Sequence, residues 1–139
     1  MIPIILTTHG EFGSALIESS EMLVGKNEKL YAITLSSGES FDDFQQRLFQ
    51  KVEEVAEDDG VLILADILGG SPYNASAVCL GRYKTECLTG LNMSMLLTAL
   101  DQRDFCDLAH LAQECREAAL SNIVNIREQL AAVTDEDDE

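Results

Sequence analysis

The sequence predicts an α/β protein, with an open, mostly parallel β-sheet and helices on both faces of the sheet. Three observations lead to this prediction. Short apolar runs suited to strands alternate along the chain with longer stretches in which apolar residues recur at helical spacing. The first of these runs is continuously apolar, which is typical of parallel strands covered on both faces. The 139 residues, 46% of them hydrophobic, suffice for one domain with its own core.

The first half of the chain reads as two strand–helix pairs. Ile2 to Leu6 is a strand that ends in a loop, and apolar residues at helical spacing from 16 to 24 predict the helix that follows. Leu30 to Leu35 is the second strand. Ser40 is suited to the N-cap of a second helix, whose apolar side runs from 41 to 55. This half of the chain therefore predicts β–α–β–α.

The third strand is the clearest in the sequence. Val61 to Ala65 is wholly apolar and runs directly into a loop that begins at Asp66. Ser71 followed by Pro72 is a strong signal for a helix start, because serine caps a helix and proline is tolerated in its first turn. We therefore expect a helix to begin at this serine.

The remaining third of the chain gives a weaker pattern. A strand over 86–89, a short helix over 93–100 and a longer amphipathic helix over 105–120 complete the alternation. Ile123 to Ile126 is the candidate for an additional, antiparallel edge strand. We expect a single domain over residues 1–130, followed by an acidic, disordered tail over 131–139.

Composition excludes several classes of protein. The formal charge of −16, from 25 acidic and 9 basic residues, disfavours nucleic-acid binding and favours a positively charged protein partner. No apolar run is long enough to cross a bilayer, so we expect a soluble, cytoplasmic protein. The four cysteines lie among apolar residues without the close spacing of a metal site, which indicates buried thiols in a reducing compartment.

Two loops carry the residues suited to chemistry. His9 follows the first strand and Asp66 follows the third, and in an open parallel sheet ligands bind at the carboxyl ends of the strands. If these strands are neighbours, the two side chains can meet. A carboxylate on one imidazole nitrogen fixes the tautomer and leaves the other nitrogen free as a nucleophile, without a metal or other cofactor. Asp66 would thus orient His9 to carry a phosphoryl group.

The segment Gly69, Gly70, Ser71 would bind the phosphoryl oxygens. Glycines let backbone N–H groups approach an anion, and a helix N-terminus adds its positive dipole end. Each feature also has a purely structural interpretation, because Gly-Gly often forms a turn and Ser-Pro often starts a helix. Their joint position on strand-end loops favours the functional interpretation.

The sequence resembles the IIA domain of the mannose-type sugar phosphotransferase system over most of its length. The resemblance rests on the order of strands and helices and on four segments, which are Thr8-His9-Gly10, Glu21-Met22-Leu23 before Gly25, Asp66-x-x-Gly69-Gly70-Ser71-Pro72-x-Asn74, and Gly90-x-Asn92-x-x-Met95-Leu96. One departure is Thr7, where the family usually has glycine. Another is the pair Ile67 and Leu68, apolar residues suited to a docking surface.

The resemblance implies a role and partners. His9 would accept a phosphoryl group from the histidine-containing phosphocarrier protein and donate it to a sugar-specific IIB subunit, with the membrane IIC and IID subunits involved only indirectly. Asp66 and Ser71 match the family's active-site acid and phosphate-binding hydroxyl. Family members form homodimers through a C-terminal strand, for which Ile123 to Ile126 is the candidate here.

Three alternatives remain open from sequence alone. A similar domain donates phosphoryl groups to dihydroxyacetone kinase. A regulatory module would keep His9 without passing the group on. A hydrolase with Ser71 as nucleophile is disfavoured, because the Gly-x-Ser-x-Gly elbow is missing and Pro72 follows the serine directly.

Overall fold

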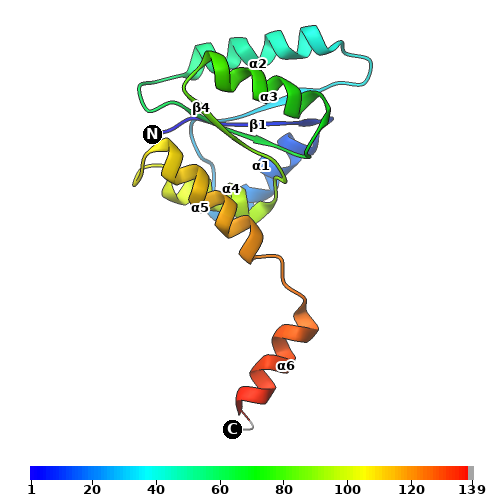
Figure 1. The fold of residues 1–139 in the computed structure, drawn as a ribbon, viewed down its shortest axis with the longest axis vertical. Helices are drawn as coiled ribbons and strands as arrows, with labels where there is room; N and C mark the ends of the chain where they lie inside the picture. Colours follow the sequence, from blue (N-terminus) through cyan, green and yellow to red (C-terminus); the bar gives the residue numbers. More distant parts are fainter. Residues whose placement is uncertain (138–139) are drawn as a thin grey trace.

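A computed structural model describes residues 1–137 of the chain. Within these residues, strands and helices alternate in the first two thirds of the chain and three helices follow (Figure 1). The elements are β1 (Ile4–His9), α1 (Phe12–Val24), β2 (Leu30–Leu35), α2 (Phe41–Val55), β3 (Val61–Ala65), α3 (Gly70–Arg82), β4 (Thr85–Leu88), α4 (Met93–Gln102), α5 (Leu108–Ser121) and α6 (Ile126–Asp137). The predicted α/β class is confirmed.

The strands of the described region form one parallel sheet in the order β2-β1-β3-β4. The central strands are in direct register, with Ile4 opposite Leu62 and Thr7 opposite Ala65. From β1 the chain crosses to one side, to β2, and from β3 it crosses to the other side, to β4. The carboxyl ends of β1 and β3 therefore form the point at which the winding reverses, where open α/β sheets bind ligands.

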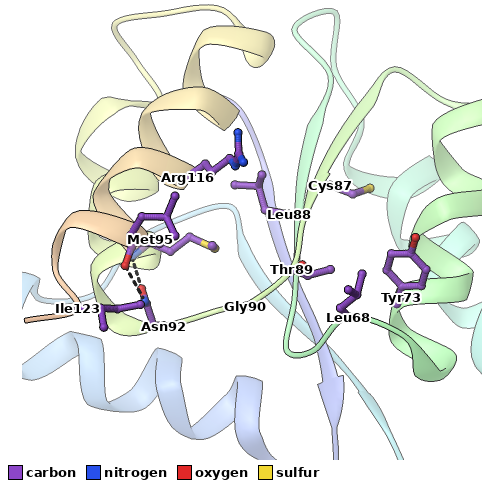
Figure 2. A pocket seen from close by; sticks show the side chains of 12 residues that line it. Leu68, Tyr73, Cys87, Leu88, Thr89, Gly90, Asn92, Met95, Arg116 and Ile123 are labelled. Carbon is purple, nitrogen blue, oxygen red and sulfur yellow. Dashed lines mark hydrogen bonds between the residues drawn. The ribbon is translucent and has the colours of Figure 1, made fainter.

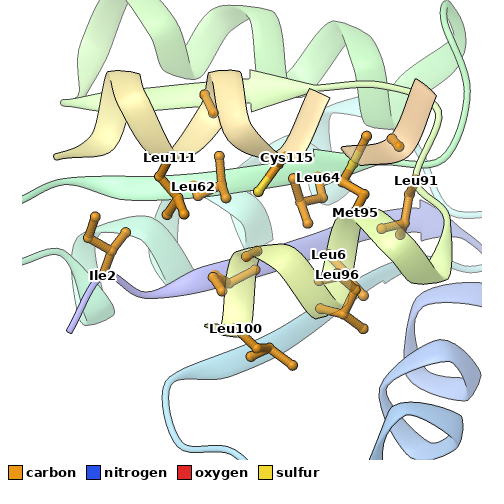
Figure 3. Close-up of a cluster of buried hydrophobic side chains, with 14 of the residues drawn as sticks. Ile2, Leu6, Leu62, Leu64, Leu91, Met95, Leu96, Leu100, Leu111 and Cys115 are labelled. Carbon is orange, nitrogen blue, oxygen red and sulfur yellow. The ribbon is translucent and has the colours of Figure 1, made fainter. Parts of the chain in front are cut away.

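Two apolar clusters hold the helices on the sheet. Because side chains alternate along a strand, Ile4 and Leu6 face α1, α4 and α5, whereas Ile5 faces α2 and α3. Figure 1 shows the two helical layers on opposite sides of the sheet, and Figure 3 shows the larger cluster, in which Leu62 and Leu64 meet Leu96 and Leu111. The two central strands, β1 and β3, are buried on both faces, as their apolar runs predict, whereas β2 and β4 at the edges are partly exposed.

Side-chain caps fix several helix starts. The Ser40 hydroxyl accepts a hydrogen bond from the Asp43 N–H at 3.1 Å, which confirms the cap predicted for α2. The α3 prediction was slightly wrong: Gly69 stands at the N-cap and Gly70 opens the helix, so Ser71 is its second residue. Both glycines have positive φ angles, +86° and +84°, which glycine adopts without the strain other residues would incur.

The C-terminal region differs from the prediction. In the described part of the chain, Ile123 to Ile126 does not form an edge strand, and α6 begins at Ile126. Asn125 explains the helix start, since its side chain accepts the Glu128 N–H at 3.1 Å. The tail expected to be disordered is helical as far as Asp137, and its last two residues lie outside the described region. Figure 1 shows α6 projecting away from the sheet and its helices.

Candidate functional site

The fold brings His9 and Asp66 together where the winding of the sheet reverses. His9 is the last residue of β1, and Asp66 directly follows the neighbouring strand β3. The imidazole Nδ1 lies 2.8 Å from Asp66 Oδ2. The contact expected from sequence, provided that the two strands are neighbours, is therefore present.

Asp66 accepts three hydrogen bonds from the site. Its Oδ2 accepts from both the backbone N–H of His9, at 2.9 Å, and the ring Nδ1, while its Oδ1 accepts from the Ile67 N–H at 2.9 Å. An ionised carboxylate can only accept, so Nδ1 carries the proton and the lone pair lies on Nε2. The carboxylate is mostly buried, with 14% of the side chain exposed, whereas the imidazole is 50% exposed. The site therefore presents an oriented, accessible nitrogen.

The free edge of the imidazole lies against the start of α3. A Cβ placed on Gly70 would lie 3.3 Å from His9 Cε1 and 3.4 Å from Nε2, so the ring lies close over this glycine. The first-turn N–H groups and the positive end of the α3 dipole are thus near Nε2, and this arrangement favours an anion there. Ser71 is half-buried in the same turn and, in the described structure, makes no hydrogen bond to His9 or Asp66.

Further hydrogen bonds fix the loop that carries His9. The Gly10 N–H donates to the Leu35 carbonyl at 2.8 Å, which ties the end of β1 to β2. The Thr8 hydroxyl, on the opposite face of the strand, accepts the Gly13 N–H of α1 at 2.9 Å. The sequence interpretation missed the Thr8 contact. The sequence feature that could have indicated it is Gly13, because glycine has a low helix propensity and is unusual in the first turn of a helix such as α1.

Exposed apolar side chains lie close to the site in sequence. Phe12 opens α1, and Ile67 and Leu68 follow Asp66 in the β3–α3 loop. Leu68 also lines a cleft of about 480 Å³ beside β4, together with Tyr73, Met95 and Arg116 (Figure 2). The β3–α3 loop therefore binds His9 through Asp66 and also contributes Leu68 to an apolar surface.

Two kinds of feature are absent from the described residues. Across residues 1–137, no three His, Cys, Asp or Glu side chains gather as a possible metal site. In the same region, no helix has the length and apolar character needed to span a bilayer.

Comparison with known proteins supports the resemblance seen in the sequence. The model of the EIIA-man family, described as PTS system fructose IIA component, matches residues 3–119. The chain belongs to this family. It is therefore a mannose-type IIA component of a sugar phosphotransferase system, and IIA components are phosphotransferases in the general sense of that system.

Individual IIA relatives agree with this assignment. The chain is 32% identical to the fructose-specific EIIA component of Bacillus subtilis over 134 residues, covering 96% of this chain and 92% of the relative. It is 33% identical over 118 residues to the mannose-specific EIIAB component of Escherichia coli, covering 81% of this chain and 36% of that longer protein. Among solved structures, the EIIA component of Streptococcus agalactiae has a TM-score of 0.85 at 30% identity, covering 92% of this chain and 99% of that one.

Proposed function

We propose that this IIA component is a phosphoryl carrier that holds the group on Nε2 of His9. The observation that carries the proposal is the hydrogen bond from Nδ1 to Asp66, which leaves Nε2 as the nucleophilic nitrogen beside the start of α3. Gly70 lies close to Nε2, and we propose that Gly69, Gly70 and Ser71 at the start of α3 bind the phosphoryl oxygens. Backbone N–H groups there would stabilise the negative charge of the transferring group.

The transfer balances without any other reactant. The Nε2 lone pair attacks phosphorus of the phosphorylated donor histidine, so a new N–P bond forms as the donor's N–P bond breaks and returns its electron pair to the donor ring. The ring of His9 gains positive character, which the Asp66 carboxylate offsets through the Nδ1 proton. In the second step an acceptor nucleophile takes the group, and the electron pair returns to Nε2.

The partners we propose are proteins. The donor is the histidine-containing phosphocarrier protein and the acceptor is a IIB subunit, with the membrane subunits reached only through IIB. Half of the His9 side chain is exposed, and the apolar side chains of Phe12, Ile67 and Leu68 are exposed nearby in sequence, which favours docking of a protein surface over enclosure of a small molecule. The charge of −16 favours a basic donor surface.

Two further parts of the proposal concern location and assembly. We propose that the chain acts in the cytoplasm, where its donor is charged. We also propose a homodimer that uses the open edge of β4, because this outer strand presents unpaired backbone groups beside the apolar cleft lined by Leu88 and Ile123.

Phosphorylation in a reconstituted system tests the proposal. The chain is incubated with phosphoenolpyruvate, the first enzyme of the system and the phosphocarrier protein, and the product is examined by intact mass and peptide mapping. We expect one acid-labile phosphoryl group on His9 and none on His9→Ala. A group mapped to another residue, or no adduct at all, would overturn the proposal.

Discharge of the labelled chain then separates the alternatives. Transfer to a IIB subunit supports the role in sugar uptake, and the relatives named as fructose- and mannose-specific components favour it. Transfer to dihydroxyacetone kinase alone would support the second pathway. A phosphorylated chain that discharges to neither would be a regulatory module.

A further inference from the structure

The Thr8 side chain connects the two segments on either side of His9. It is fully buried at the end of β1, and its hydroxyl accepts the Gly13 N–H of α1 at 2.9 Å. The same hydroxyl lies 3.5 Å from the Gly10 carbonyl, which is too long for a strong hydrogen bond. The contact with Gly13 is therefore the principal one, and it closes a short turn that contains His9.

The helix is shaped to receive this side chain. A Cβ on Gly13 would lie 3.1 Å from Thr8 Oγ1, 3.2 Å from its Cγ2 and 3.3 Å from Leu6 Cβ, so a larger residue would push these neighbours apart. The residue at the N-cap of α1, Glu11, supplies no side-chain cap among the described residues. The Thr8 hydroxyl satisfies a first-turn N–H in its place.

Anchoring Thr8 on one face of the strand sets the orientation of His9 on the other. Successive side chains of a strand point to opposite faces, so a rotation at Thr8 turns the next peptide and moves the imidazole. His9 is held from the other side by Asp66, which accepts both its backbone N–H and Nδ1. A small displacement would separate Nδ1 from the carboxylate and shift Nε2 away from Gly70.

We propose that Thr8 is a positioning residue, whose hydroxyl bond to Gly13 holds His9 in the tautomer and orientation needed for phosphoryl transfer. This inference rests on the proposed role of His9. It adds to that role a residue whose hydroxyl bonds to Gly13 and makes no hydrogen bond to Asp66 in the described structure.

Two substitutions separate the hydroxyl from the shape of the side chain. Thr8→Val keeps the volume but leaves the buried Gly13 N–H without its acceptor, whereas Thr8→Ser keeps the hydroxyl. We expect Thr8→Val to slow phosphorylation by about tenfold to a hundredfold, as small misplacements of reacting groups do, and Thr8→Ser to retain a rate close to the original. Ser20→Ala is the matched control, since it removes a different buried hydroxyl, that of Ser20 in α1, which donates to the Ile17 carbonyl at 2.6 Å.

A spectroscopic measurement distinguishes positioning from general destabilisation. The nitrogen-15 shifts of the His9 ring report which nitrogen is protonated. We expect protonation on Nδ1 in the unmodified chain and in Thr8→Ser and Ser20→Ala, and a mixture with Nε2-protonated imidazole in Thr8→Val. If Thr8→Val does not fold, Gly13→Ala disturbs the same contact from the helix side and should give the same mixture.

The outcomes are distinct. An unchanged His9 spectrum and rate in Thr8→Val, or an equal loss in Ser20→Ala, would overturn the positioning role. If the unmodified chain is not phosphorylated at all, the proposed function fails, and the ring-nitrogen comparison still decides whether Thr8 orients His9.

Discussion

At the scale of single residues, the geometry of the site depends on the hydrogen bonds that both carboxylate oxygens of Asp66 accept. Its two oxygens accept from Nδ1 of His9 and from two backbone N–H groups, those of His9 and Ile67. The carboxylate therefore orders the imidazole and the loop at the same time. No other residue type has two acceptor oxygens at this chain length, so the position is sensitive to replacement by its own amide.

Asp66→Asn tests this arrangement. Whichever way the amide is turned, its NH₂ group faces an N–H donor, so either the bonds to His9 or the bond to Ile67 is lost. We expect the fold to persist and the phosphorylation rate to fall by about a hundredfold or more, because the tautomer is no longer fixed. Single-turnover kinetics with the phosphorylated donor and a circular dichroism spectrum measure both effects. An unaltered rate would exclude an orienting role for the carboxylate.

Gly70→Ala tests the packing of the imidazole against α3. The added Cβ would lie 3.3 Å from His9 Cε1, and the φ of +84° would cost an alanine about 1–2 kcal/mol. We expect a lower melting temperature and slower phosphorylation.

Gly81→Ala is the matched control in the same helix, because open space surrounds that position and alanine favours the helix by about 0.5–1 kcal/mol. Equal effects of the two substitutions on phosphorylation would contradict the proposed contact between Gly70 and the ring.

At the scale of elements, Arg103 ties α4 to the end of the sheet opposite the site. Its guanidinium is buried and donates to the backbone carbonyls of Lys29 at 3.0 Å, Glu28 at 2.6 Å and, more weakly, Ile2 at 3.4 Å. Burial lowers the pKa of Arg103, since it disfavours the charged form. The three carbonyls precede β1 and β2, so this side chain links the starts of both strands to α4.

Arg103→Met should therefore weaken the fold without altering the chemistry. Loss of the hydrogen bonds made by the buried guanidinium is expected to reduce the free energy of unfolding by about 1–3 kcal/mol. The phosphorylation rate of the folded fraction should not change, because the site lies at the other end of the strands. Urea denaturation of Arg103→Met, with the exposed Arg116→Met as control, measures the difference. Equal stability of the two variants would contradict a structural role for Arg103.

The sequence predicted most elements, and the exceptions have identifiable causes. Val61 to Ala65 was clear because a continuous apolar run is stable only in a strand covered on both faces. The start of α3 was predicted one or two residues too late. The Ser-Pro pair suggested a cap at Ser71, whereas the N-cap of the helix is Gly69. At Ile123 to Ile126 the apolar pattern favoured a strand, but the cap formed by Asn125 begins a helix.

The candidate site was predictable in part. His9 and Asp66 were identified because each is a polar residue directly after an apolar strand, at the sheet edge where ligands bind. Their contact depends on the strand order, which follows from the sides to which the helices cross and not from any local pattern. The contact of Thr8 with Gly13 was beyond prediction, because it joins two elements through an approach visible only in three dimensions.

At the scale of the whole molecule, the core contains ionisable groups in neutral form. The four cysteines are free thiols, but the predicted burial holds for only two of them. Cys79 and Cys115 are fully buried in opposite apolar clusters, whereas Cys87 and Cys106 are partly buried. Burial raises the pKa of Cys79 to about 11 and that of Cys115 to about 12, from an ordinary value of 9.0. The folded state therefore binds these protons more tightly than the unfolded state does.

Stability should fall at alkaline pH for this reason. Below about pH 9 the thiols are neutral in both states; above it they ionise first in the unfolded chain, so stability is lost as the pH rises from about 9 to about 12. The double variant Cys79→Ala, Cys115→Ala should be less stable at pH 7, because it leaves cavities, but should lose less on going to about pH 10.5. Denaturant titrations of both proteins across this range measure the two slopes. Parallel slopes would contradict the assignment.

The order of the strands places His9 and Asp66 at the carboxyl ends of the two inner strands, β1 and β3. A dye or affinity handle fixed to α6, which projects from the body (Figure 1), would therefore leave the reacting nitrogen's surroundings intact. For the carrier role proposed above, this arrangement leaves the outer strands free for contacts with other proteins. Protein contacts at the outer strands would not compete for the space around Nε2 of His9.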